Sequence, residues 1–249
     1  MERWRLVHTF EASAALAMGL DQALLRNEAA DARPVLRLYT WSPGTLSLGY
    51  FQRHARIPAA VAALASGTPP ILRRSTGGGA IHHQDELTFS IVAPQEHALY
   101  RGPVAESYVR VHELLIEALA AFGVEAHLRG AAPLRSDREG DGMCFHDSTS
   151  LDIAWSGRKG VGSAQRRTAG RVLHHGSIKL GTTPLEGEIA TVREACPGVT
   201  AADVAAEITH VAALRWSAEF EPEPPTRGEL ARAETHGARH LAPDFVRRR

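Results

Sequence analysis

Three strand-like segments between Ser150 and Leu180 constrain the fold more than any other feature of this 249-residue chain. Their sequences are SLDIAW, RKGVGSAQRR and RVLHHGSIKL, and only the short turn signals Ser156-Gly157 and Ala169-Gly170 separate them. Two-residue connections join antiparallel neighbours, so this region predicts a β-meander. Elsewhere, strand-like and helix-like runs come in blocks without regular βαβ alternation. We therefore expect an α+β fold with mixed or antiparallel β-sheets flanked by helices.

Hydrophobic periodicity predicts the remaining elements. Strands are expected at residues 3–9 and at VLRLYTW, TLSLGY, ILRRS and LTFSIVAP. Helices are expected at residues 12–27, 58–66, 104–122, 186–195 and 201–220. The stretch EPEPP then predicts a linker, which is followed by a charged helix and a basic tail. We expect this helix to be exposed to solvent. The expected division is therefore a folded domain at residues 1–216 and this appendage at residues 217–249.

Charge and composition argue against several classes of protein. The chain has 28 basic and 28 acidic residues, so it lacks the basic excess of most nucleic-acid-binding proteins. No apolar run approaches the ~20 residues that cross a bilayer, and the first residues do not form a signal peptide. We expect a cytoplasmic protein with neither a nucleic acid nor a membrane as partner. Cys144 and Cys196 are the only cysteines, so neither a disulfide framework nor a cysteine-rich zinc site is expected.

The segment RRSTGGGAIHHQDELTFS, residues 73–90, combines three successive glycines with two histidines. The glycines permit positive φ and a close approach of backbone N–H groups to a ligand, although a tight turn would need the same residues. The spacing does not match a nucleotide-binding P-loop, and a strand follows where a dinucleotide site has a helix. His82 and His83 point to opposite faces of a strand, so we expect no metal site here.

Lysine is rare in this chain. Lys159 and Lys179 are the only lysines, and every other basic residue is arginine. A lysine that persists in such a background is a candidate for a role that needs a compact ammonium or the loss of a proton. Lys179 alternates with Ile178 and Leu180, and we expect it at the surface.

A turn at Ser156-Gly157 predicts the faces of the hairpin that carries Lys159. Trp155 would lie opposite Arg158, and Ala154 opposite Lys159. One face, which has the large-against-small pattern of a core, would hold Leu151, Ile153, Trp155, Gly160, Gly162 and Ala164. The other face would line a cleft and hold Asp152, Lys159, Val161 and Ser163. A register shift of one residue would invert this assignment.

Cys144 lies between this hairpin and the stretch RGAAPLRSDREGDG, residues 129–142, which has no periodicity and predicts a mobile surface loop. A free cysteine is either a small buried hydrophobic residue or a nucleophile. An ammonium supplied by the hairpin would favour the thiolate that attacks a thioester. Cys196, near a predicted helix end, lacks such surroundings and is expected to serve packing alone.

Three segments resemble the lipoate-protein ligase and octanoyltransferase family, which is related to the catalytic domain of biotin protein ligases. They are MGLDQALL, the glycine-rich segment, and GRKGVGSAQRRTAGRVLHHGSIKL. The third is the most specific, because K-x-x-G-S-A is followed at the family's spacing by H-G-S. The resemblance extends from Trp4 to Leu180 and implies a catalytic domain of this fold within residues 1–216.

The resemblance implies an acyl-transfer chemistry and a set of site residues. Octanoyltransferases of this family take octanoate from acyl carrier protein through a cysteine thioester, without a cofactor, and pass it to a lysine of a lipoyl domain or the glycine cleavage H protein. One branch carries its nucleophile in a C-F element before the lysine block, which corresponds to Cys144-Phe145, with Lys159 assisting. The residues implied to line the acyl pocket are Arg74, Gly77, Gly78, Gly79, His83 and Ser163.

Two alternatives stay open. An ATP-dependent lipoate ligase, which needs ATP and magnesium, is favoured by Gly79, because many transferases have arginine there. Gln84 also replaces the acidic residue that usually follows the motif histidine. The segment after Gly181 looks too short for the accessory domain of many ligases, although some ligases obtain it as a separate chain. A non-catalytic acyl- or biotin-binding module is the other alternative. We expect an octanoyltransferase with Cys144 as nucleophile.

Overall fold

The structure is a computed structural model and describes residues 1–26, 33–54, 64, 67–138, 140 and 142–248. Within these residues the main sheet has eight strands in the order β11-β1-β2-β6-β10-β9-β8-β7, and a small sheet has the order β4-β3-β5. The strands are β1 (Glu2–Ala12), β2 (Val35–Trp41), β3 (Thr45–Leu48), β4 (Ile71–Arg73), β5 (Ile81–His83), β6 (Glu86–Pro94), β7 (His127–Leu128), β8 (Ile153–Trp155), β9 (Arg158–Thr168), β10 (Arg171–Lys179) and β11 (Ala218–Pro222).

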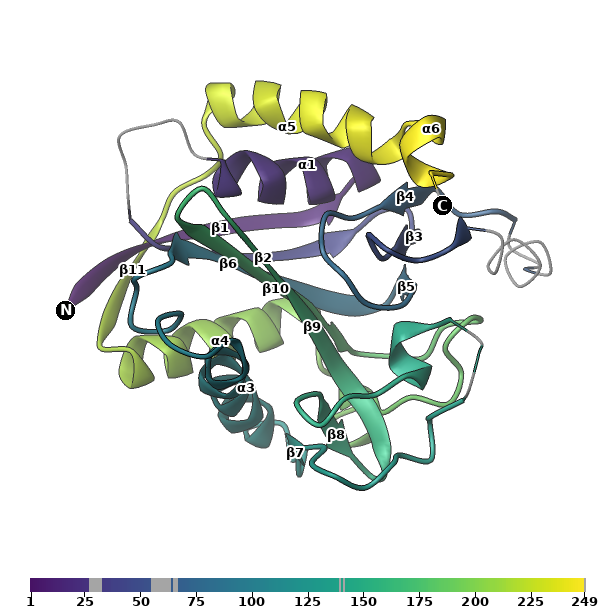
Figure 1. Cartoon of the computed structure of the whole chain (residues 1–249). Helices are drawn as coiled ribbons and strands as arrows, with labels where there is room; N and C mark the ends of the chain where they lie inside the picture. Colours follow the sequence, from purple (N-terminus) through teal and green to yellow (C-terminus); the bar gives the residue numbers. More distant parts are fainter. Residues whose placement is uncertain (27–32, 55–63, 65–66, 139, 141, 249) are drawn as a thin grey trace.

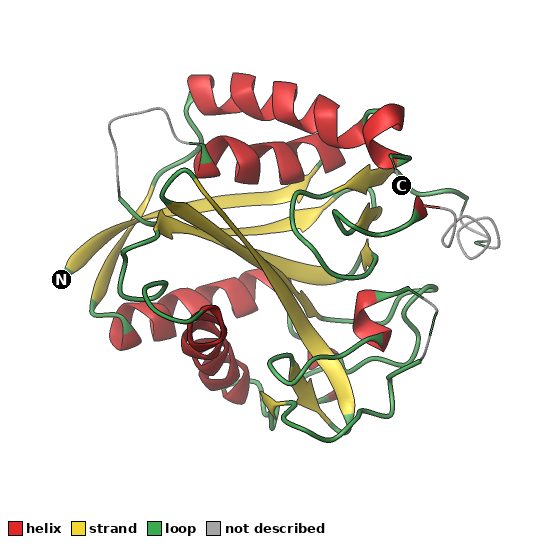
Figure 2. Cartoon of the chain, in the orientation of Figure 1, coloured by secondary structure: helices red, strands yellow, loops and turns green. Residues whose placement is uncertain are grey.

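Helices cover both faces of the main sheet (Figure 1). They are α1 (Ala14–Leu25) and α5 (Arg227–Leu241) on one face, α3 (Val104–Ala120) and α4 (Ala201–Arg215) on the other, and the short α6 (Pro243–Val246) after α5. Neighbouring residues such as Leu6 and Val7 enter different hydrophobic clusters, one under each helix layer. Figure 2 shows strands at the centre and helices outside. The sheet is parallel at β11-β1-β2 and antiparallel elsewhere, which confirms the expected mixed α+β fold.

The predicted meander of β8, β9 and β10 is confirmed, and its first turn uses positive φ at Ser156 and Gly157. Trp155 pairs with Arg158 and Ala154 with Lys159, as predicted. The next pair is Ile153 with Val161, so Gly160 is an extra residue in β9. A Cβ atom on Gly160 would overlap the ring of Trp155, which explains why glycine occupies the bulge.

The bulge inverts the predicted faces of β9 beyond Gly160. Val161 joins the core with Ile153 and Trp155, where we had expected it to line a cleft. Gly162 instead lies on the side of Lys159, with a distance of 2.9 Å between its Cβ position and Lys159 Cε. The register shift that would invert the assignment is therefore present, and it starts one residue after the lysine.

The segment after Gly181 differs from the prediction in two places. Residues 186–195 do not form an α-helix; within them the structure has a 3₁₀ turn, η3 (Val192–Glu194). The helix predicted at residues 201–220 ends at Arg215, and the chain continues as β11 in parallel pairing with β1. In β11, Ala218 and Phe220 pack on the core. The helix predicted at residues 58–66 falls outside the described residues, apart from Leu64.

The predicted C-terminal helix is confirmed as α5. The prediction that this helix is solvated is wrong, because α5 packs closely on α1. A Cβ atom on Gly19 would overlap the carbonyl of Ala233, and one on Gly237 would overlap the carbonyl of Ala15. Arg5 of β1 also donates two hydrogen bonds, of 2.6 and 2.9 Å, to the carboxylate of Glu229. The C-terminal residues thus brace the first helix from outside.

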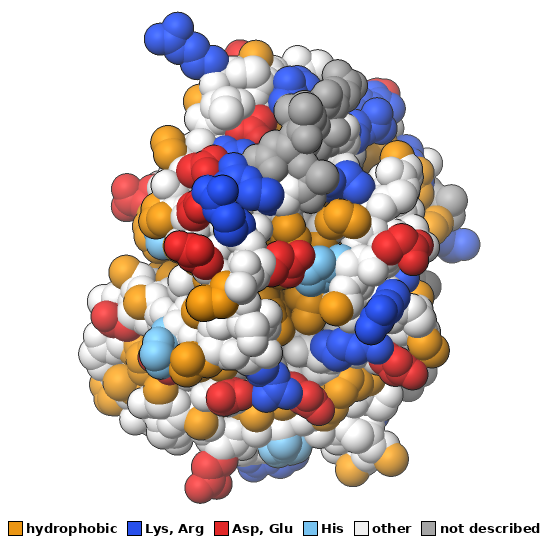
Figure 3. All heavy atoms as spheres, turned by 90° about the vertical axis from the view of Figure 1, so that its left-hand side faces the viewer, with side chains coloured by type: hydrophobic (Ala, Val, Ile, Leu, Met, Phe, Trp, Pro, Cys, Tyr) orange, Lys and Arg blue, Asp and Glu red, His pale blue; other side chains and the backbone are white. Residues whose placement is uncertain are grey.

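Charges of both signs are interspersed on the face in Figure 3. Arg215 of α4 forms ion pairs with Glu113 and Glu117 of α3. None of the described helices is long and apolar enough to cross a membrane.

Candidate active site

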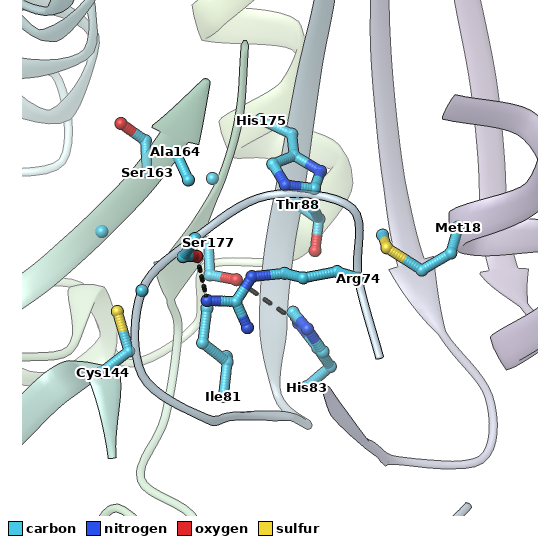
Figure 4. Close-up of a pocket in the computed structure, with 14 residues that line it drawn as sticks. Met18, Arg74, Ile81, His83, Thr88, Cys144, Ser163, Ala164, His175 and Ser177 are labelled. Atoms are coloured by element: carbon cyan, nitrogen blue, oxygen red, sulfur yellow. Dashed lines mark hydrogen bonds between the residues drawn. The ribbon is translucent and has the colours of Figure 1, made fainter. Parts of the chain in front are cut away.

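A cavity lies where the glycine-rich loop approaches β9, β10 and α1 (Figure 4). The small sheet and β6 complete the wall, so segments far apart in sequence meet there. Its lining residues are Met18, Arg74, Gly77, Gly78, Ile81, His83, Thr88, Cys144, Gly162, Ser163, Ala164, His175, Gly176 and Ser177. Of the predicted site residues, Gly79 and Lys159 lie just behind this lining.

The glycine-rich loop runs directly beside the cysteine. Ala80 N–H donates to the carbonyl of Gly142 (2.8 Å), and Cys144 N–H donates to the carbonyl of Ala80 (2.7 Å). A Cβ atom on Gly79 would lie 2.8 Å from both Cys144 N and the oxygen of Gly142, so only glycine fits. Within the described part of the chain, the N–H groups of Gly77, Gly78 and Gly79 donate to no protein acceptor. Backbone N–H groups without a protein acceptor can stabilise a developing negative charge.

Cys144 begins a 3₁₀ turn, η2 (Cys144–His146), and its half-buried thiol lines the cavity. Phe145 anchors the turn because its fully buried ring packs with Ile81 and Ile189. The thiol is therefore held at one side of the cavity, as Figure 4 shows.

Lys159 is 2% exposed and points at the cysteine segment. Its Nζ atom lies 2.8 Å from the carbonyl oxygen of Cys144, 2.9 Å from Asp152 Oδ2, 3.3 Å from the carbonyl oxygen of Asp147 and 3.6 Å from Cys144 Sγ. Burial by itself would lower the pKa of Lys159, but its interactions with Cys144 and with the Asp152 carboxylate raise it. The side chain is thus a fixed ammonium, and a compact one is required in this space.

Gly162 leaves room for this pair. A Cβ atom there would lie 2.9 Å from Lys159 Cε, 3.3 Å from Lys159 Nζ and 3.5 Å from Cys144 Sγ. The glycine of K-x-x-G-S-A is therefore needed because a side chain at this position would crowd the lysine and the thiol.

Arg74 lines the cavity, and its guanidinium holds the glycine-rich loop in place. Nη2 donates to the carbonyls of Gly77 (2.6 Å) and Gly79 (2.8 Å), and Nη1 donates to Ser47. Burial lowers the pKa of Arg74.

His83 also lines the cavity and is held on three sides. Its Nδ1 shares a 2.7 Å hydrogen bond with Glu86, its Nε2 a 2.8 Å bond with Ser47, and its ring stacks on Trp41 at 4.0 Å. Burial lowers the pKa of His83, and it lowers the pKa of His82 to about 4. No three histidine, cysteine, aspartate or glutamate side chains of the described chain gather into a metal-binding group.

Three polar residues of the lining were not predicted. His175 shares hydrogen bonds with Thr76 (2.7 Å) and Asp21 (3.1 Å). Ser177 and Thr88 both donate to Glu86, at 2.8 and 2.7 Å. The H-G-S motif was a signal for the first two, since His175 and Ser177 flank its glycine on one face of β10. Because these side chains are already satisfied by protein partners, the wall that they form suits an apolar occupant.

Ser163 borders the cavity, but its hydroxyl points away from it (Figure 4). The hydroxyl bonds to His112 (2.7 Å) and His174 (2.9 Å) on the α3 side. The bulge at Gly160 explains this placement, because it turns Ser163 to the face opposite Lys159.

Lys179 corrects another prediction, because it is fully buried rather than at the surface. Its Nζ atom lies 2.6 Å from Glu186 and 2.8 Å from Glu86, and it donates to the carbonyl of His82. Burial opposes its charge, but the two carboxylates raise the pKa of Lys179. Its ammonium also lies 4.8 Å from the ring centre of Phe145, behind the cysteine turn.

The segment predicted as a mobile surface loop before Cys144 is attached to the hairpin. Ser136 is fully buried, and its hydroxyl accepts a 3.1 Å hydrogen bond from Lys159 N–H. Asp137 accepts hydrogen bonds from the backbone of Leu134 and Ser148. The loop is therefore part of the site's support.

A family model described as the lipoyl protein ligase A/B catalytic domain matches residues 13–195. The octanoyltransferase LipM of Kyrpidia tusciae is 38% identical over 193 residues, which cover 74% of this chain and 68% of that protein. The octanoyltransferase LipM of Moorella thermoacetica is 32% identical over an alignment of 271 positions, which covers 100% of this chain and 99% of that protein.

Solved structures share the fold. A putative lipoate protein ligase from T. acidophilum, with bound lipoic acid, superposes with a TM-score of 0.77 at 21% identity and covers 99% of this chain and 100% of its own. A lipoate-protein ligase A bound with ATP has a TM-score of 0.77 at 20% identity and covers 99% of each chain. At these identities the likeness concerns the fold alone.

Proposed function

The chain belongs to the lipoyl protein ligase A/B catalytic-domain family, and we propose that within this family it is an octanoyltransferase that carries the acyl group on Cys144. Relatives named octanoyltransferase LipM, at 32–38% identity, support this assignment. The expected cytoplasmic location stays a prediction.

One observation carries the proposal: the ammonium of Lys159 is held by the cysteine segment itself. Besides the thiol, its partners are the carbonyls of Cys144 and Asp147 and the carboxylate of Asp152, all between residues 144 and 152. The ammonium nitrogen lies 3.6 Å from Sγ, where it can pair with the negative charge of the nucleophilic form of the cysteine. The pair thus has the geometry of an activated nucleophile beside an apolar cavity.

The reaction follows in two acyl transfers. The Cys144 thiolate attacks the carbonyl carbon of an octanoyl thioester on acyl carrier protein, and the N–H groups of Gly77 to Gly79 stabilise the oxyanion. The carrier thiol leaves with a proton from Lys159, and the octanoyl group remains on Sγ. The neutral amine of an acceptor lysine then attacks, the Cys144 thiolate leaves, and the amine's proton passes to Lys159. The acceptor is a lipoyl domain or the glycine cleavage H protein.

No ATP enters this scheme, because the donor thioester is already activated. The ligase alternative uses ATP and magnesium to activate a free acid, and Gly79 is the feature that favours it. The two schemes differ in whether Cys144 becomes covalently modified.

A transfer assay separates the alternatives. The protein is incubated with octanoyl-acyl carrier protein and a lipoyl domain without ATP, and the mass of the lipoyl domain is measured by intact mass spectrometry. We expect octanoylation that Cys144→Ala abolishes and that Cys196→Ala, the matched control at the other thiol, leaves unchanged. Modification that occurs only with ATP and free lipoate would instead identify a ligase, and no modification under either condition would identify a binding module.

A further inference from the structure

We propose that Met18 is the stop that sets the length of the acyl chain, an inference that rests on the proposed function. Met18 comes from α1, is buried, and lines the cavity. Figure 4 shows its thioether entering the cavity from the side opposite Cys144, with Arg74 and His83 between them. A chain attached to Sγ and extended through the cavity ends against Met18.

The side walls select for an alkyl chain but not for its length. The polar groups of Thr88, His175 and Ser177 are bonded within the protein. Each added methylene is therefore accommodated alike along the walls, and only the closed end can discriminate between one length and the next.

The space behind Met18 is apolar. Its side chain packs with Ala14 and Leu72, and with the partly buried Trp41 and Leu241. These residues come from α1, β4, β2 and α5. Shortening Met18 therefore extends an apolar cavity toward further apolar side chains.

Met18 is held in a fixed position, because α1 is packed between α5 and the sheet. The backbone contact at Gly19, one residue after Met18, leaves no space for α1 to move outward. A longer chain must then compress the Met18 side chain itself. Methionine is unbranched and adaptable, so we expect a graded preference rather than complete exclusion.

The test is a competition between acyl chains. Wild type, Met18→Ala and the control Leu24→Ala are each mixed with equal amounts of octanoyl- and decanoyl-acyl carrier protein, and the two acyl-enzymes are quantified by intact mass. Leu24 lies on the same helix but packs into the cluster on the main sheet, away from the cavity. We expect the decanoyl-to-octanoyl ratio to rise about tenfold or more in Met18→Ala, as for one or two methylenes in an apolar pocket, and to stay at the wild-type value in Leu24→Ala.

A wild-type ratio in Met18→Ala, or an equal rise in Leu24→Ala, would overturn the inference. If wild type forms no acyl-enzyme, the proposed function fails by itself, and the same proteins are compared by calorimetric binding of free octanoate and decanoate. A shift toward decanoate in Met18→Ala alone would still support the stop, and an unchanged preference would overturn it.

Discussion

Lys159 Nζ lies 3.6 Å from Cys144 Sγ, although a loop, a strand and a turn separate the two residues in sequence. Asp152 closes the arrangement from the start of the hairpin, with its carboxylate 2.9 Å from the same nitrogen. A single stretch of the chain, residues 144–159, therefore supplies the nucleophile, the cation and the anion that holds the cation in place.

Replacing Lys159 by methionine should slow alkylation of Cys144 by iodoacetamide about tenfold or more at pH 7, because the thiolate loses its ammonium. It should also destabilise the protein by about 3–5 kcal/mol, since Asp152 is left buried without its cation. The double variant Lys159→Met/Asp152→Asn separates these effects. It should regain stability in urea unfolding while alkylation stays slow, and fast alkylation in it would argue against a role of Lys159 in activation.

Gly162→Ala should displace the lysine from the thiol, because the added methyl group would lie 2.9 Å from Lys159 Cε. We expect at least about tenfold slower octanoyl transfer, as for a misplaced catalytic group. Gly187→Ala is the control, since nothing lies within 4 Å of its Cβ position. Wild-type kinetics in Gly162→Ala would show that the Lys159 position is not critical.

Acid should destabilise the fold through its neutral buried histidines. Burial lowers the pKa of His82 to about 4, and burial together with nearby positive charge lowers the pKa of His174 well below 6.5. The unfolded chain therefore binds protons below pH 6.5 that the folded chain does not. The free energy of unfolding should fall with decreasing pH, by up to about 1.4 kcal/mol per pH unit for each such histidine.

Urea unfolding at pH 7.5 and pH 5 measures this dependence. His174→Gln should reduce the loss of stability between the two values, whereas His127→Gln, at an exposed position, should not. An equal loss in both variants and wild type would assign the effect to other groups.

Gly237→Ala should destabilise the whole protein by about 2 kcal/mol, because the methyl group overlaps the carbonyl of Ala15 in α1. Gly228→Ala, on an exposed part of the same helix, should be neutral or stabilising. Chemical unfolding followed by tryptophan fluorescence gives both values. Unchanged stability in Gly237→Ala would mean that residues 217–249 behave as a separate appendage.

The local parts of the fold were predictable, and the parts that depend on distant packing were not. The turn at Ser156-Gly157 follows from residue type, and it correctly placed Lys159 opposite Ala154. The bulge at Gly160 did not follow, because it depends on where the ring of Trp155 packs. Strand β11 was missed because its parallel partner, β1, begins the chain.

The site divides in the same way. The chemical groups Cys144 and Lys159 stood out by rarity and position, and the structure brings them together. Lys179 has the same rarity, but the carboxylates that allow its burial come from separate segments, at Glu86 and Glu186. Met18 carries no chemical signal, and the role proposed for it rests on the packing of α1 against the cavity.

In the proposed reaction Cys144 becomes acylated, and the mass of the enzyme reports this modification. Purified protein is mixed with octanoyl-acyl carrier protein without ATP, and its intact mass is recorded before and after hydroxylamine treatment. We expect a gain of one octanoyl group that hydroxylamine removes and that peptide mapping assigns to Cys144. An unmodified enzyme that nevertheless octanoylates a lipoyl domain, or an adduct at another residue, would contradict it.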